Sequence, residues 1–121
     1  MDRERFSELV AEAIESLPPQ FLEKMDNVEV VIEGWPSREA LLRAGLPPGQ
    51  TLFGLYEGIP LTKRTSNYGM VLPDKITIYQ GPIEACFRTP EEIRRQVQKT
   101  VIHEIAHHFG IDDERLDELG W

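Results

Sequence analysis

Residues 89–110 constrain the fold most, because they read as one long amphipathic helix with a defined start and end. Thr89 is a good N-cap, Pro90 suits the first helical position, and Glu92 completes a capping-box pattern. Gly110 accepts the left-handed conformation that ends many helices. Apolar residues recur between these signals at helical spacing: Ile93, Val97, Val101, Ile105 and Phe109. We therefore expect this helix to bury one side in a core.

The polar side of the same helix carries the pattern H-E-x-x-H, with His103, Glu104 and His107. Residues four apart on a helix lie on one face, roughly 5–6 Å apart at Cβ, so the two imidazoles can bind one divalent ion. Zinc favours such nitrogen ligands. Glu104 falls beside the metal, where a general base takes a proton from water. The plainer alternative is a solvated face whose histidines happen to be four apart.

A third protein ligand is expected, because catalytic zinc usually has three and keeps a position for water. Gly110 lets the chain turn back after His107, which brings Asp113 toward the pair. Alternatively, Asp112 or Asp113 serves as the N-cap of a short final helix over residues 114–119. One aspartate can fill each role, and the spacing favours Asp113 as the ligand.

The extended pattern H-E-x-x-H-x-x-G-x-x-D resembles the aspartate-ended motif of metzincin-type zinc peptidases. Three stretches, residues 55–61, 72–79 and 103–120, are more closely similar to the small bacterial zincin-like metallopeptidases. These stretches extend the resemblance over about two thirds of the chain, from its middle to the last residues. One departure is the methionine turn that metzincins place beneath the metal. No methionine follows Met70, so that support is absent or replaced.

The resemblance implies an α+β, zincin-like fold. A small mixed β-sheet would be backed by an N-terminal helix and the motif helix, with a short C-terminal helix. It also implies one zinc per chain and a strand, directly before the motif helix, that forms the sheet edge beside the cleft. Thr77 and Tyr79 on that strand would then border the cleft and add a peptide as a further strand. The alternative is a strand covered by its neighbours. Gln96 and Thr100 are the candidate cleft residues on the helix, unless that face is only solvated.

The remaining elements follow from apolar spacing and from breaker residues. We expect a helix from about Phe6 to Leu17, ended by two prolines, and a short helix capped by Ser37 and stopped at Gly45. Strands are expected over residues 28–33, 51–57 and 75–80. The basic segment 62–69 reads as a surface hairpin, or else as a loop over the cleft.

Charge and cysteine content narrow the class of protein. The net charge of −8 disfavours nucleic acid and anionic membranes as partners. No apolar run has the length of a signal or a membrane span, and the single Cys86 fits a reducing compartment. We expect a cytoplasmic protein that forms one domain over residues 1–121.

Several weaker candidates accompany the motif. His108 points toward the apolar arc, so a hydrogen-bonded core histidine is favoured over another metal ligand. Cys86 is expected to be an inert buried thiol, although a thiolate can bind zinc. Stabilisation of the oxyanion is assigned to no residue with certainty; the candidates are Tyr56, Tyr68 and Tyr79.

Three functions remain open from the sequence. The first is a zinc-dependent metallopeptidase that cleaves a peptide or protein substrate through a metal-activated water, with Glu104 as general base. The second is a non-catalytic domain that binds a peptide or protein on the same scaffold, with or without a structural metal. The third is a purely structural metal site, whose removal would unfold the chain.

Overall fold

The computed structural model describes residues 1–45, 52–58 and 73–121. The elements in chain order are α1 (Arg3–Glu15), α2 (Pro19–Leu22), η1 (Glu23–Met25), β1 (Val28–Glu33), α3 (Arg38–Arg43), β2 (Gly54–Glu57), β3 (Asp74–Tyr79), α5 (Gln80–Cys86), α6 (Pro90–His108) and α7 (Asp113–Glu118). The expected α+β composition is confirmed: an N-terminal helix, a small sheet, the motif helix and a short C-terminal helix are all present. Segment 62–69, with Tyr68, lies outside the described residues.

The sheet is mixed, as predicted, and has the strand order β1-β3-β2. β3 pairs in parallel with β1 and antiparallel with β2. The prediction that the strand before the motif helix forms the sheet edge is therefore wrong, because that strand is β3 and it lies in the centre. Among the described strands, β2 is the outer one on the side of the motif helix. Neighbouring strands in a sheet are set by non-local pairing, which strand propensity alone does not reveal.

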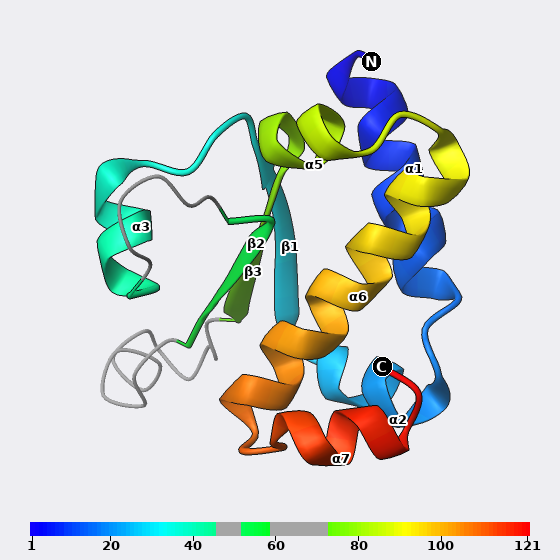
Figure 1. Cartoon of the computed structure of the whole chain (residues 1–121), viewed down its shortest axis with the longest axis vertical. Coiled ribbons are helices and arrows are strands. Elements are labelled where there is room, and N and C mark those ends of the chain that lie inside the picture. Colours follow the sequence, from blue (N-terminus) through cyan, green and yellow to red (C-terminus); the bar gives the residue numbers. More distant parts are fainter. Residues whose placement is uncertain (46–51, 59–72) are drawn as a thin grey trace, which may run out of the picture.

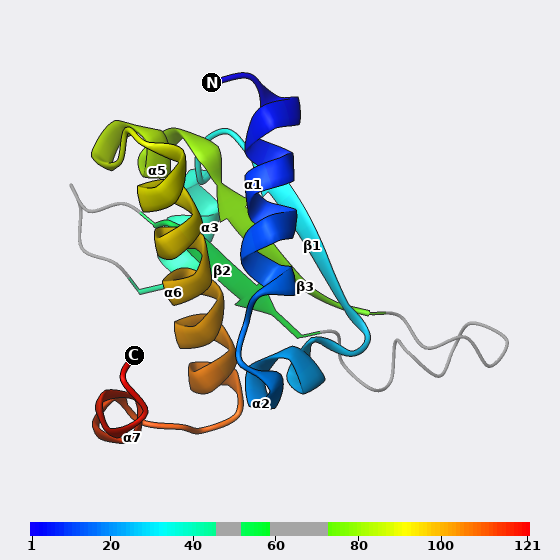
Figure 2. The ribbon, with the colours of Figure 1, turned by 90° about the vertical axis from the view of Figure 1, so that its right-hand side faces the viewer.

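Helices α1 and α6 lie side by side over one face of the sheet, and α3 lies on the opposite side (Figures 1 and 2). Alternate residues of β3 point to this shared face, and Ile76 and Ile78 are fully buried there. The core includes these further residues: Phe6, Leu9, Val10, Ala13, Ile93, Val97, Val101, Ile102 and Ile105. The apolar spacing read from the two helices is thus the spacing of their buried faces.

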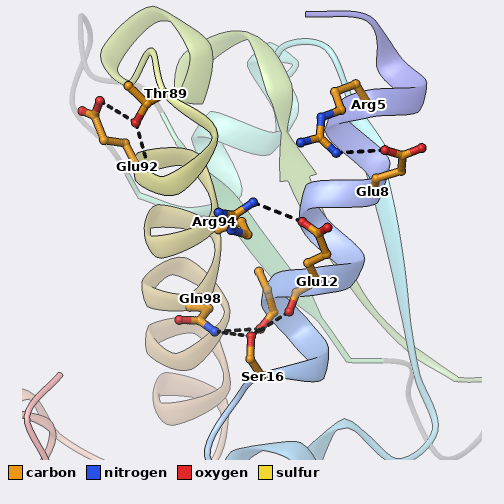
Figure 3. Close-up of polar contacts among 9 residues, drawn as sticks. Arg5, Glu8, Glu12, Ser16, Thr89, Glu92, Arg94 and Gln98 are labelled. Atoms are coloured by element: carbon orange, nitrogen blue, oxygen red, sulfur yellow. Dashed lines mark hydrogen bonds and ion pairs between the residues drawn. The ribbon is translucent and has the colours of Figure 1, made fainter.

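Polar contacts flank the core between α1 and α6 (Figure 3). Arg94 pairs with Glu12 at 3.2 Å, and Gln98 donates to the main-chain oxygen of Ala13 at 2.9 Å and to the hydroxyl of Ser16 at 3.0 Å. These contacts take up polar groups on one side of α6, and its opposite flank is left for the histidine motif.

The predicted cap of α6 is present. The Thr89 hydroxyl accepts from the main-chain N–H of Glu92 at 3.1 Å and donates to the Glu92 carboxylate at 2.9 Å (Figure 3). Ser37 caps α3 in the same way by accepting from the N–H of Ala40 at 3.0 Å. These caps satisfy N–H groups that have no partner inside the helix, which is why they locate helix starts reliably.

The sequence did not predict α5, whose first turn contains Gly81 and Pro82, and two local predictions are wrong. Cys86, at the end of α5, is exposed and not buried. Phe109 is 49 % exposed at the end of α6, and the Lys24 ammonium lies 4.7 Å from the centre of its ring. The buried part of the apolar arc thus ends at Ile105, and the last apolar residue of the pattern, Phe109, lies outside the core.

No helix among the described residues combines the length and apolar character that crossing a membrane requires.

Gly54 lets the edge strand approach α6 closely. A Cβ atom at this position would lie 2.6 Å from Cγ2 of Thr100 and 3.0 Å from the main-chain oxygen of Thr77. Glycine inside a strand often marks such an approach of two backbones or of a backbone and a side chain. The spacing between β2 and the motif helix therefore depends on the missing side chain.

We predict that Gly54→Ala lowers the free energy of unfolding by about 1–3 kcal/mol, because the added methyl group forces β2 and α6 apart. Urea unfolding measures the loss. Gly34→Ala is the matched control, since its Cβ would meet only Nη2 of Arg3, at 3.9 Å. Thr100→Ser removes the clashing methyl group and should recover part of the loss in the double variant. A Gly54→Ala protein as stable as the Gly34→Ala control would contradict the close approach.

Candidate metal centre and cleft

The end of α6 and the start of α7 bring the predicted ligands together. Gly110 has a φ of 78°, and the N–H of Ile111 donates to the main-chain oxygen of Ala106 at 2.7 Å, which closes the helix. Asp112 then caps α7 by accepting from the N–H of Arg115 at 2.8 Å. Asp113, the first residue of α7, is left to face the histidines. Asp112 thus takes the capping role, and Asp113 lies near His107 as a candidate ligand.

His103, His107 and Asp113 each offer one donor atom, and these three atoms lie within 4.8 Å of one another. Nε2 of His107 is 3.5 Å from Oδ1 of Asp113. Zinc bound tetrahedrally at about 2.1 Å needs donor atoms about 3.4 Å apart. The His107–Asp113 distance already fits, and both side chains are exposed and free to adjust. Two imidazole nitrogens and one carboxylate oxygen also form a donor set that zinc accepts, so these residues fit the ion.

His103 is oriented by the end of the described chain. Its Nε2 lies 2.9 Å from the main-chain oxygen of Trp121, whose own N–H donates to the oxygen of Leu116 at 2.8 Å. Leu116 is fully buried and anchors α7 against the core. A metal ligand nitrogen must give up its proton, so metal binding through Nε2 would replace this hydrogen bond.

Glu104 is held by the edge strand. Its Oε1 accepts from the main-chain N–H of Tyr56 in β2 at 2.9 Å. Burial raises the pKa of Glu104 above its ordinary value, while the Tyr56 hydrogen bond and the charges of His107 and His103 act in the lowering direction. A carboxyl group with a raised pKa, fixed beside candidate metal ligands, is a stronger base than an ordinary carboxylate and is a candidate for proton transfer.

A cavity of about 220 Å³ opens beside Glu104, between the start of β2 and α6. Its lining residues are Leu52, Phe53, Gly54, Gln96, Lys99, Thr100, His103 and Glu104. The two helical cleft candidates, Gln96 and Thr100, both line it, and Gln96 donates to the Thr100 hydroxyl at 3.0 Å. Two residues of the motif, His103 and Glu104, are thus part of the cavity wall.

The two cleft candidates on β3 do not reach this cavity. Thr77 is fully buried, and its hydroxyl oxygen has no hydrogen-bond partner in the described structure. Tyr79 is 3 % exposed. Burial is the largest cause of its raised pKa, and the nearby charges of Glu33 and Glu57 raise the pKa further. Residues 77 and 79 point to the face opposite Ile76 and Ile78, away from α6. Their assignment to the cleft is wrong because β3 is central and covered on both sides.

His108 is not the core histidine that the sequence predicted. Its ring is 38 % exposed and stacks on Tyr56, with ring centres 4.1 Å apart. Its Nε2 lies 3.8 Å from Oδ2 of Asp74, which also accepts from the Tyr56 hydroxyl at 2.6 Å. In the last turn of α6 the side chain of His108 thus contacts β2 and not the buried core. His108 therefore fastens β2 to the helix end.

Sequence reasoning missed two contributors to the site. The main-chain N–H of Tyr56 carries no side-chain signature, so its bond to Glu104 has no signal in composition or spacing. The cavity wall formed by Leu52 and Phe53 was read only as part of a strand. Gly54, within that predicted strand, was the available signal for a close backbone approach.

We predict that Glu104→Gln stabilises the metal-free protein at pH 7 by less than about 1 kcal/mol, since the site is partly solvated. The pKa of Glu104 is raised in the folded state, so folding favours the protonated form. The charge therefore costs stability above the folded pKa, and this cost fades as the pH falls through it. Urea unfolding with a chelator, from pH 7 to pH 4, measures the difference. Glu15→Gln, at an exposed position of α1, is the control; a gain that does not shrink on acidification contradicts the raised pKa.

Comparison with known proteins agrees with this geometry. A solved structure of a conserved hypothetical protein from Thermo thermophilus is 27 % identical, with a TM-score of 0.56 over 90 % of this chain and 94 % of that one. No curated protein shows significant similarity. The family model of zincin-like metallopeptidases matches residues 25–121, which include every element of the site. This match confirms the resemblance and the zincin-like fold class. The chain belongs to the zincin-like metallopeptidase family.

Proposed function

We propose that the protein is a zinc-dependent peptidase in which Glu104 is the general base. The observation that carries the proposal is the convergence of three donor atoms within 4.8 Å, next to a carboxylate fixed by the edge strand. Membership of a zinc metallopeptidase family supports the class of reaction. The substrate would be a peptide or a protein segment.

His103, His107 and Asp113 would hold the zinc. When bound, zinc polarises a carbonyl group and makes water more acidic, which is the chemistry that amide hydrolysis lacks in water alone. Glu104 would take a proton from the attacking water and pass it to the leaving amine. Its desolvated carboxylate is a stronger base than one in water, and its fixed orientation keeps it aimed at the site.

The side of β2 that faces away from β3 is the most suitable place for an extended substrate. One edge of β2 pairs with β3, and the other edge faces α6. The hydrogen bond from the Tyr56 N–H to the Glu104 carboxylate lies on that second edge. A peptide added along that edge would run past Glu104 and the cavity beside it. This replaces β3, the strand that the sequence favoured for the same role.

We predict that Glu104→Gln keeps roughly one zinc per chain but lowers peptide cleavage by 10²–10⁴-fold, because only proton transfer is removed. Metal analysis and mass spectrometry of a mixed peptide pool measure the two properties. A zinc-loaded wild type that cleaves nothing would reject the peptidase and favour a non-catalytic binding domain. Unfolding on chelation would instead favour a structural metal.

The neighbouring histidines offer a matched pair for the metal. We predict that His107→Ala weakens zinc binding by more than about 100-fold, since the loss of a ligand exceeds the loss of an outer-shell partner. His108→Ala should leave zinc affinity unchanged within a few fold, because its ring contacts Tyr56 and Asp74. Competition titration with a zinc-binding dye reports both. Equal losses in the two variants would contradict the assigned ligands.

A further inference from the structure

Two parallel rows of polar side chains run along α6 from the metal ligands toward its N-terminal end. Residues four apart share a face, so one row consists of His107, His103, Lys99, Arg95 and Glu91. The adjacent row consists of Glu104, Thr100, Gln96 and Glu92. Lys99 lines the 220 Å³ cavity together with His103 and Glu104. Lys99 and Arg95 also line a second cavity of about 480 Å³, with Gly120 and Trp121 on its far side. Lys99 therefore lies between two hollows next to the motif.

Of the nine other Lys and Arg side chains that the structure describes, five contact a carboxylate, and the two cations of this row do not. Among the described residues, neither Lys99 nor Arg95 makes an ion pair, whereas the following cations contact a carboxylate: Arg5, Arg43, Lys75, Arg94 and Arg115. The protein carries a net charge of −8, so carboxylates are abundant. Two adjacent cations left without one beside a candidate cleft are available to an anionic ligand.

We propose that Lys99, assisted by Arg95, binds a carboxylate of the substrate, so that the enzyme prefers peptides with an acidic side chain or a free carboxyl terminus near the cleaved bond. This inference rests on the proposed peptidase function. Lys99 lies one helical turn, about 6 Å along the axis, from His103. An extended peptide advances about 3.3–3.6 Å per residue, so the carboxylate would lie roughly two residues from the cleaved bond.

The lining of the smaller cavity fits an acidic side chain better than a basic or a large apolar one. Leu52 and Phe53 provide apolar contact for a short aliphatic stem, and Gln96 with Thr100 provides hydrogen-bonding groups opposite them. Lys99 supplies the only full positive charge among its lining residues besides any carried by His103. Glu104 would repel an anion placed directly at its carboxylate, so the carboxylate of the substrate belongs at the Lys99 end.

The test uses the zinc-loaded full chain and one neutral peptide core in matched versions. Glu, Gln or Lys is placed two residues from the cleaved bond on either side, and separate versions end in a free carboxylate or an amide. The variants are Lys99→Glu and Lys99→Met, with Arg88→Glu as the control. Arg88 is exposed in the turn before α6, lines neither cavity and makes no ion pair among described residues. It reproduces the charge change away from the cleft.

We expect the wild type to favour Glu over Gln peptides by about five- to tenfold in kcat/KM, as one partly exposed charge pair allows. Lys99→Met should abolish this preference, Lys99→Glu should reverse it toward Lys peptides, and Arg88→Glu should keep it. Preference for the Glu peptides identifies a side-chain carboxylate, and preference for the free acid over the amide identifies the terminal one. Equal rates across all versions would overturn the inference and leave the peptidase intact.

Binding to Glu104→Gln separates this inference from the proposed function. Fluorescence anisotropy of labelled peptides should show the same charge preference without cleavage, and it should be lost in Glu104→Gln/Lys99→Met. If the wild type cleaves no peptide but this preference is present, the peptidase fails and the carboxylate site stands. Equal binding of the Glu, Gln and Lys peptides, or no measurable binding, overturns the carboxylate site.

Discussion

The structure depends on one helix that must bury one side and present another. The apolar residues of α6 pack against α1 and the sheet, and this fixes the rotation of the helix about its axis. His103, Glu104 and His107 then emerge along one flank, because helical positions have a set angular spacing. The packing of the core therefore also sets the direction of the candidate metal ligands. A change that rotates α6 would disturb both.

The candidate site also depends on β2, whose main chain holds the Glu104 carboxylate of α6. Gly54 allows β2 to come close to α6, and the N–H of Tyr56 reaches the Glu104 carboxylate at 2.9 Å as a result. Partial removal of a carboxylate from water is unfavourable, and one main-chain hydrogen bond offsets only part of that cost. The remainder raises the pKa of Glu104, and a raised pKa is what the proposed role as general base would use. The same burial thus costs stability and supports the proposed reactivity.

Features that depend on near neighbours in the chain were predictable. The caps at Thr89, Ser37 and Asp112 and the turn at Gly110 all follow from local backbone groups that need partners. Features that depend on distant segments were not. The order of strands placed β3 in the centre, which buried Thr77 and Tyr79 and gave the edge to β2. The prediction that His108 is a core histidine was wrong for a related reason, because helical periodicity does not reveal where the core ends.

Charge distribution links the fold to the cleft. In the described structure, acidic residues pair with cations on α1, α3, β3, α6 and α7. Exposed ion pairs of this kind add little stability. Their main effect is on the charge distribution, because they neutralise some cations and leave others without a carboxylate. The row of Arg95 and Lys99 is unbalanced and adjoins the cavities, within a protein of net charge −8. An overall negative field repels anionic molecules at long range, while the local cations attract a carboxylate only after contact. Such an arrangement would give selectivity for an acidic group through short-range contacts with two exposed cations, and added salt would weaken it.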